Sequence, residues 1–153
     1  MLNAVLKELD ASYAKLWDTK PAEIDNIFKR NAKNGKHFSV WIGAYGAIDI
    51  VCSNAYKYVS WGKKHFGDFT TIKQDACDSM KGSAGAYRIS FGMSDFADLL
   101  VKVGDAYLEC KDYAEFEELS KKIHLYASRM FYWLDGMIPW AKLSETFNSL
   151  MGL

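Results

Sequence analysis

The chain has 153 residues, of which half are apolar and a quarter are charged, and its 19 basic residues balance its 19 acidic ones. This length fits one domain over residues 1–153, large enough for a core that needs no disulfide or metal. Disordered chains combine low hydrophobicity with high net charge, and nucleic-acid binding usually leaves a basic excess. The composition therefore argues against a disordered chain and against a nucleic-acid-binding protein.

The apolar residues recur with a helical period along almost the whole chain. Residues 2–17 carry one apolar stripe and are predicted to form an amphipathic helix. Pro21 suits the first turn of a second helix, where its missing N–H costs nothing. The Asn34-Gly35 pair tolerates the left-handed backbone of a helix C-cap and is predicted to end this second helix.

A third helix is predicted over residues 38–61. Phe38, Val40 and Ile42 alternate as a strand would, but the length of the apolar run favours a helix. Because it is apolar on most of its sides, we expect it to be the central helix of the domain. A bilayer span is disfavoured, since Asp49 would lie near its middle at a cost of several kcal/mol.

A fourth helix is predicted after Asp68 or Thr70, either of which can act as its N-cap. Residues 82–92 follow as the most glycine-rich stretch of the chain. Tyr87, Ile89 and Phe91 alternate there, which is typical of an extended segment. We therefore expect a loop that presents Tyr87 and Arg88.

Ser94 is predicted to cap a fifth helix, and Asp112 with Glu115 has the spacing of a capping box for a sixth. Gly136 and Pro139 should end the sixth helix, and residues 140–150 read as a short closing helix. The sequence thus predicts an all-α protein, a compact bundle of six or seven helices around an apolar central helix.

Cys52, Cys77 and Cys110 are widely spaced and form neither a C-x-x-C pair nor a zinc-like cluster with histidine. We expect free thiols in a reducing compartment and no metal or other cofactor. The N-terminal residues lack the apolar core of a signal peptide. These features predict a cytoplasmic protein.

No catalytic motif is present, and His37, His65 and His124 read as surface or boundary residues. Asp49 is the most unusual acid, because its neighbours in GAIDIV are apolar. A buried carboxylate needs a partner, and perturbed acids gather at functional sites. A structural role for Asp49 and an enzyme site around it therefore both stay open. We name no catalytic residue.

The 23 aromatic residues are many for one small bundle, and exposed aromatics are frequent in protein interfaces. We therefore expect a non-enzymatic protein-binding module, such as an adaptor, an inhibitor or an immunity-type protein. Its partner would be another protein, with a homodimer left open and neither nucleic acid nor a membrane expected. The residues predicted to bind the partner are Trp61, Lys63, Phe66, Tyr87, Arg88 and Tyr132.

A pocket between helices for a small apolar or aromatic ligand is the alternative function. Trp41, Tyr45 and Asp49 follow one another at helical spacing and would line that pocket.

Overall fold

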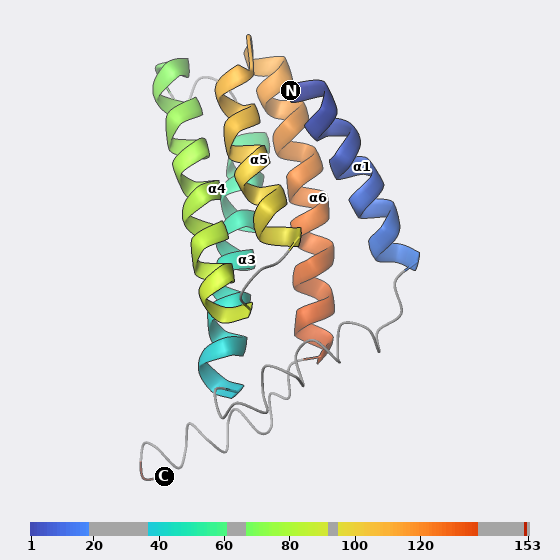
Figure 1. The fold of residues 1–153 in the computed structure, drawn as a ribbon. Helices are drawn as coiled ribbons and strands as arrows, with labels where there is room; N and C mark the ends of the chain where they lie inside the picture. The colour runs from blue at the N-terminus through green and yellow to red at the C-terminus, as the bar shows by residue number, and fades with distance from the viewer. Residues whose placement is uncertain (19–36, 61–66, 92–94, 138–151, 153) are drawn as a thin grey trace.

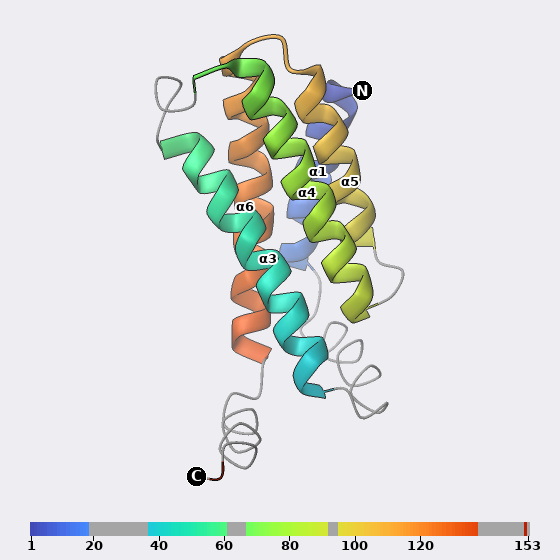
Figure 2. The ribbon, with the colours of Figure 1, turned by 90° about the vertical axis from the view of Figure 1, so that its left-hand side faces the viewer.

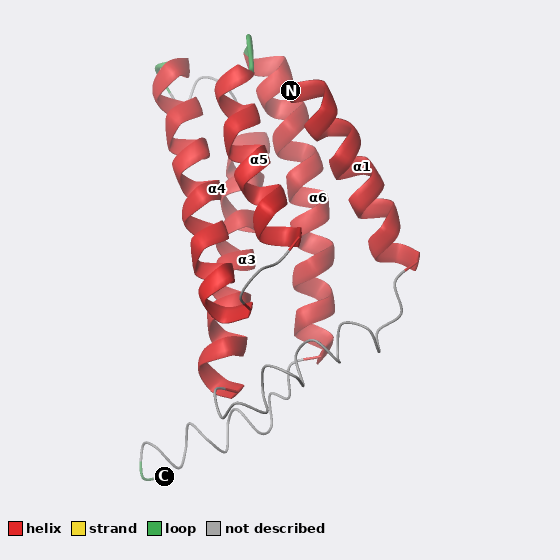
Figure 3. Cartoon of the chain, viewed as in Figure 1, coloured by secondary structure: helices red, strands yellow, loops and turns green. Residues whose placement is uncertain are grey.

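The computed structural model describes residues 1–18, 37–60, 67–91, 95–137 and 152. For residues 17, 18, 37–45, 90, 91 and 132–137, it describes the backbone but not the side chains. This part of the chain holds five helices and no strand (Figure 3). The helices are α1 (Leu2–Asp18), α3 (His37–Ser60), α4 (Phe69–Phe91), α5 (Asp95–Glu109) and α6 (Tyr113–Met137). The all-α prediction is confirmed.

The predicted count of six or seven helices is not confirmed. It rests on the second helix, near residues 21–34, and on the closing helix at 140–150, and both lie outside the described residues.

Short polar side chains begin two of the helices. The Thr70 backbone N–H donates to Asp68 Oδ1 at 3.3 Å, and the Thr71 hydroxyl donates to Asp68 Oδ2 at 2.9 Å. Of the two predicted caps for α4, Asp68 is the one in use. These two hydrogen bonds lower the pKa of the Asp68 carboxyl, and the bond from the Thr71 hydroxyl has the larger effect. At α6, the Glu115 N–H donates to Asp112 Oδ1 at 2.9 Å, as the capping-box spacing predicts.

The helices pack as neighbours in a bundle (Figures 1 and 2). The most extensive contacts join α4 with α5, α3 with α6, and α3 with α4. The helices α5 and α6 touch each other at few points, and α1 packs against both of them. None of the helices described is long and apolar enough to cross a membrane.

The core follows the predicted stripes. The aligned apolar residues of α5 are all buried, namely Phe96, Leu99, Leu100, Val103 and Tyr107, and so is Cys110 just after the end of the helix. The rings of Tyr58 and Tyr107 lie 5.1 and 4.9 Å from that of Phe116, centroid to centroid. The buried hydroxyl groups of Tyr107 and Ser120 are 2.9 Å apart and satisfy each other.

The third predicted helix is one continuous helix, as expected, but the described part of it is not surrounded on all sides. Its core side buries Ile48, Val51 and Tyr58. Its other sides leave Asp49, Ile50, Ser53 and Tyr56 exposed. The prediction of a central helix is therefore wrong there: α3 packs against α4 and α6 and turns a side with both polar and apolar residues to solvent.

The predicted loop at residues 82–92 is also wrong, because α4 continues as a helix to Phe91. Each glycine costs the helix up to about 1 kcal/mol relative to alanine. Burial of Ser83, Ala84 and Tyr87 on the helical period offsets that cost. A Cβ atom at Gly82 or Gly85 would meet nothing within 4 Å, so these glycines lie on the open side of α4.

Candidate functional site

The helices α3 and α6 run antiparallel and place side chains from distant parts of the chain together. At one end, the Tyr113 hydroxyl of α6 donates to the Tyr58 carbonyl of α3 at 2.7 Å. Further along, His124 of α6 lies beside Cys52 of α3. Contacts here join Cys52, Tyr56, His124 and Ser128. With the exposed Leu125, which follows His124 in the chain, we call them the α3/α6 patch.

His124 connects the two sides of the patch. Its Nδ1 lies 3.3 Å from the Cys52 carbonyl oxygen, to which it donates when Nδ1 carries the ring proton. The Ser128 hydroxyl oxygen lies 3.5 Å from each ring nitrogen. The Tyr56 ring leans on the imidazole, with ring centroids 5.6 Å apart and a tilt of 47°. The half-buried histidine therefore supports an aromatic ring from the neighbouring helix.

Cys52 is a thiol rather than a thiolate at neutral pH. Burial raises the pKa of its thiol to about 11, and the hydroxyl of Ser128, 4.0 Å from Sγ, opposes that rise only in part. The thiolate is the nucleophilic form of cysteine, so a raised pKa disfavours nucleophilic chemistry at this position.

The outer rim of the patch is apolar and open to solvent. Tyr56 is 59% exposed, and Leu125, next to His124 in the chain, is 52% exposed. Single exposed apolar residues are normal on protein surfaces. Here, however, the exposed Tyr56 ring of α3 rests against a histidine of the neighbouring helix α6. Tyrosine combines a large apolar body with a polar hydroxyl.

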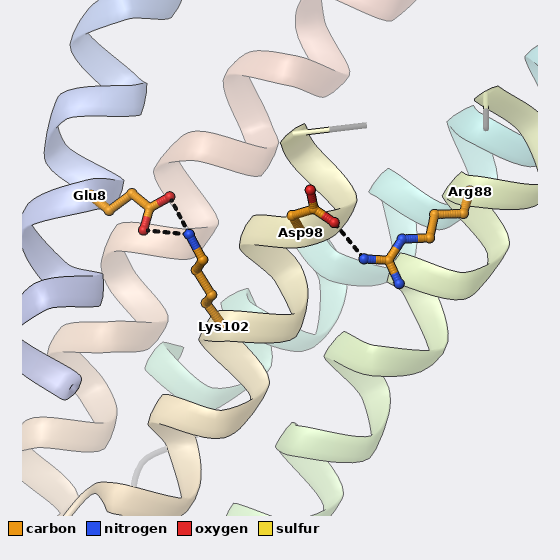
Figure 4. Close-up of polar contacts among 4 residues, drawn as sticks. All are labelled: Glu8, Arg88, Asp98 and Lys102. Carbon is orange, nitrogen blue, oxygen red and sulfur yellow. Dashed lines mark hydrogen bonds and ion pairs between the residues drawn. The ribbon is translucent and has the colours of Figure 1, made fainter. Parts of the chain in front are cut away.

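Two of the predicted partner-binding residues make contacts within the protein. Tyr87 is buried, with its ring 4.9 Å from that of Phe96, so the prediction that it is a surface anchor is wrong. The guanidinium of Arg88 forms an ion pair with Asp98 of α5 at 2.5 Å (Figure 4). Because residues 82–91 are helical, the period turns Tyr87 inward and Arg88 toward α5.

The other predicted partner-binding residues are not placed. Trp61, Lys63 and Phe66 lie outside the described residues, and the Tyr132 side chain does too, although its backbone belongs to α6.

Asp49 does not line a pocket between helices, although the alternative function predicted that it would. Asp49 is exposed on α3, so the expectation of a buried carboxylate is wrong. It follows buried Ile48 in the chain, and the turn of about 100° per residue carries Asp49 away from the core. Trp41 and Tyr45 lie in α3, in the part whose side chains are left aside. The hypothesis of an enzyme site around Asp49 assumed a buried carboxylate, so the exposure of Asp49 removes its support.

A groove of about 540 Å³ lies elsewhere, where the start of α1 meets the turn between α5 and α6. It is lined by Met1, Leu2, Asn3, Leu6, Glu109, Lys111, Glu115 and Glu118. Small-molecule sites are usually enclosed and mostly apolar, whereas this groove is open and rimmed by charges. In the part of the chain that the structure describes, no three His, Cys, Asp or Glu residues gather as a metal site would require.

Comparisons with protein-family models, with curated proteins and with solved structures gave no match to this chain.

Sequence reasoning did not single out Tyr56 or Leu125. One signal was available for Tyr56: it lies four residues after Cys52, on the flank of the buried stripe of α3 rather than within it. The signal for Leu125 is similar, since it lies between the buried positions Ile123 and Tyr126 but on the outer side of α6.

Proposed function

We propose that this protein is a non-enzymatic protein-binding module, of the adaptor, inhibitor or immunity type, and that the α3/α6 patch is its docking surface. The observation that carries the proposal is the exposed Tyr56 ring, which is supported by His124. Leu125, the residue after His124 in the chain, is exposed as well. Tyrosines held rigidly are frequent anchors of protein interfaces, because they bury much area for little loss of conformational entropy.

Catalysis by the same residues has less support. The Ser128 hydroxyl lies 3.5 Å from the His124 ring, longer than the roughly 2.6–3.2 Å expected between a nucleophile and its base. Cys52 is protonated at neutral pH. The balanced net charge also favours a protein partner over a polyanion.

We further propose that the protein acts in the cytoplasm. Cys52, Cys77 and Cys110 are free thiols, and the two that are buried are protected in the core. Free thiols persist in a reducing compartment.

Site-specific photo-cross-linking tests the docking surface. A photoreactive phenylalanine analogue placed at position 56, in the cells that make the protein, should give a discrete adduct with one other protein. Leu108 on α5 is the matched control, because it too is a partly exposed apolar residue but lies outside the patch. The same adducts from positions 56 and 108, or none from position 56, would contradict the proposal.

A further inference from the structure

The groove at the start of α1, beside the turn between α5 and α6, is lined by apolar side chains of α1 (Figure 1). Leu2 and Leu6 lie one turn apart on α1, and both are partly buried against the core. The groove volume of about 540 Å³ falls within the roughly 300–1,000 Å³ of pockets that hold a drug-sized ligand. Because the groove is open, it has room for a few residues of a chain that continues at both ends.

Most acidic side chains on α1, α5 and α6 have a basic partner, and Figure 4 shows two of these ion pairs. Among the described residues, the acids so paired are Glu8, Asp10, Asp98, Asp105, Glu109 and Glu117. The described acids of these helices that form no ion pair are Asp95, Glu115 and Glu118. Asp95 and Glu115 lie in first turns, where the helix dipole favours an acid, but Glu118 lies beyond that turn. Glu115 and Glu118 both line the groove.

The groove is therefore negatively charged where α6 borders it. Glu115 and Glu118 are three residues apart on α6, so they lie on the same side of the helix and repel each other. Lys111 also lines the groove and opposes only one of these two charges. Glu109 is already engaged, since its Oε2 accepts the Leu2 backbone N–H at 2.9 Å. A cation that enters the groove would offset the remaining repulsion.

We propose that this groove binds a segment of a partner protein in which an apolar side chain lies next to an arginine or lysine. The apolar side chain contacts Leu2 and Leu6, and the basic group lies between Glu115 and Glu118. Arginine fits this place best, because its guanidinium presents several N–H donors to two carboxylates at once. The groove shares no residue with the α3/α6 patch, so the proposal does not rest on that surface.

A titration followed by NMR tests the proposal with synthetic peptides as the probes. Isotope-labelled protein is titrated with a blocked hexapeptide that alternates leucine with arginine. Two matched peptides replace either the arginines by glutamates or the leucines by serines. We expect the leucine–arginine peptide to shift the amide signals of Leu6 and Glu118, and the matched peptides to bind about tenfold more weakly or worse. Added salt should weaken the binding, because exposed ion pairs are screened.

The Glu115→Gln/Glu118→Gln variant should bind the leucine–arginine peptide about tenfold more weakly, because it loses two exposed ion pairs. Glu117→Gln is the matched control: Glu117 is on the same helix but already pairs with Lys121 at 3.0 Å, so its loss should leave the affinity unchanged.

Equal binding of the leucine–arginine and leucine–glutamate peptides would overturn the proposal. So would signal shifts confined to the α3/α6 patch, unchanged affinity of the double variant, or no binding at millimolar peptide. The comparison of peptides uses the unaltered protein, so it does not depend on the folding of the variants.

Discussion

The imidazole Nδ1 of His124 lies 3.3 Å from the carbonyl oxygen of Cys52, and this contact joins α6 to α3 at the surface. It brings together residues 72 positions apart in the chain. The same imidazole supports the exposed ring of Tyr56. The pairing of α3 with α6 thus buries the Cys52 thiol and supports the exposed Tyr56 ring. Both features can be tested.

Cys52 should react slowly with thiol reagents. With a pKa of about 11 rather than the ordinary 9.0, its thiolate fraction at neutral pH is about a hundredfold lower than for an ordinary thiol. The alkylation rate of Cys52, followed by mass spectrometry of its peptide, should rise with pH until about pH 11. The Ser128→Ala variant should react more slowly still near neutral pH, because the serine hydroxyl lowers the thiol pKa. A rate that levels off below pH 9 would contradict this assignment.

Stability should fall at alkaline pH. Burial raises the pKa of Cys52 to about 11, that of Cys110 to about 12 and that of Tyr58 to about 12. A group with a raised pKa in the folded state stabilises the fold fully below its unfolded pKa, and this contribution is lost as pH rises through the folded value. The free energy of unfolding, measured with urea, should therefore decline from about pH 9 to about pH 12. A constant value over that range would refute the prediction.

The buried hydroxyl pair of Tyr107 and Ser120 should be strongly coupled. The Tyr107→Phe change leaves the Ser120 hydroxyl buried without its partner, 2.9 Å away in the native protein. We expect a loss of about 1–2 kcal/mol in the free energy of unfolding. The double variant Tyr107→Phe/Ser120→Ala should lose less than the sum of the single variants. Strict additivity would show that the hydroxyl groups do not depend on each other.

Two glycines should respond to substitution in opposite ways. At Gly104 a Cβ atom would lie 3.1 Å from the Cys77 carbonyl oxygen, so α4 and α5 approach closely there. We expect Gly104→Val to lower the free energy of unfolding by about 1–3 kcal/mol. At Gly85 a Cβ atom would meet open space. Gly85→Ala should therefore raise the free energy of unfolding by about 0.5–1 kcal/mol, because alanine favours a helix more than glycine does. Thermal denaturation of both variants checks this pair, and a stabilised Gly104→Val protein would contradict it.

Much of the helical core could be predicted from the sequence, because burial follows a local period. The α5 stripe, the first helix and the Asp112 cap needed only spacing and side-chain chemistry. The segment 82–91 shows the limit of such reasoning. Its glycines and its alternation favoured a loop, but burial of Ala84 and Tyr87 against the core decided for a helix.

The candidate site was harder to predict, because it depends on how α3 and α6 pair. Nothing local to Tyr56 indicates that His124 will lie beneath its ring. Nor does the apolar sequence around Asp49 reveal that one side of α3 stays uncovered. Exposure is a property of the assembled bundle, and reasoning from local composition assigned both Asp49 and Tyr87 to the wrong environment.

The affinity of a Tyr56→Ala/Leu125→Ala variant for the cross-linked partner tests the central claim most directly. Both side chains are more than half exposed, so their removal should leave the melting temperature nearly unchanged. If the α3/α6 patch is the docking surface, affinity should fall by about thirtyfold or more, the effect of losing an interface anchor worth about 2 kcal/mol. The Leu108→Ala variant should bind as the unaltered protein does. Unchanged affinity of the double variant, with its fold intact, would contradict the account.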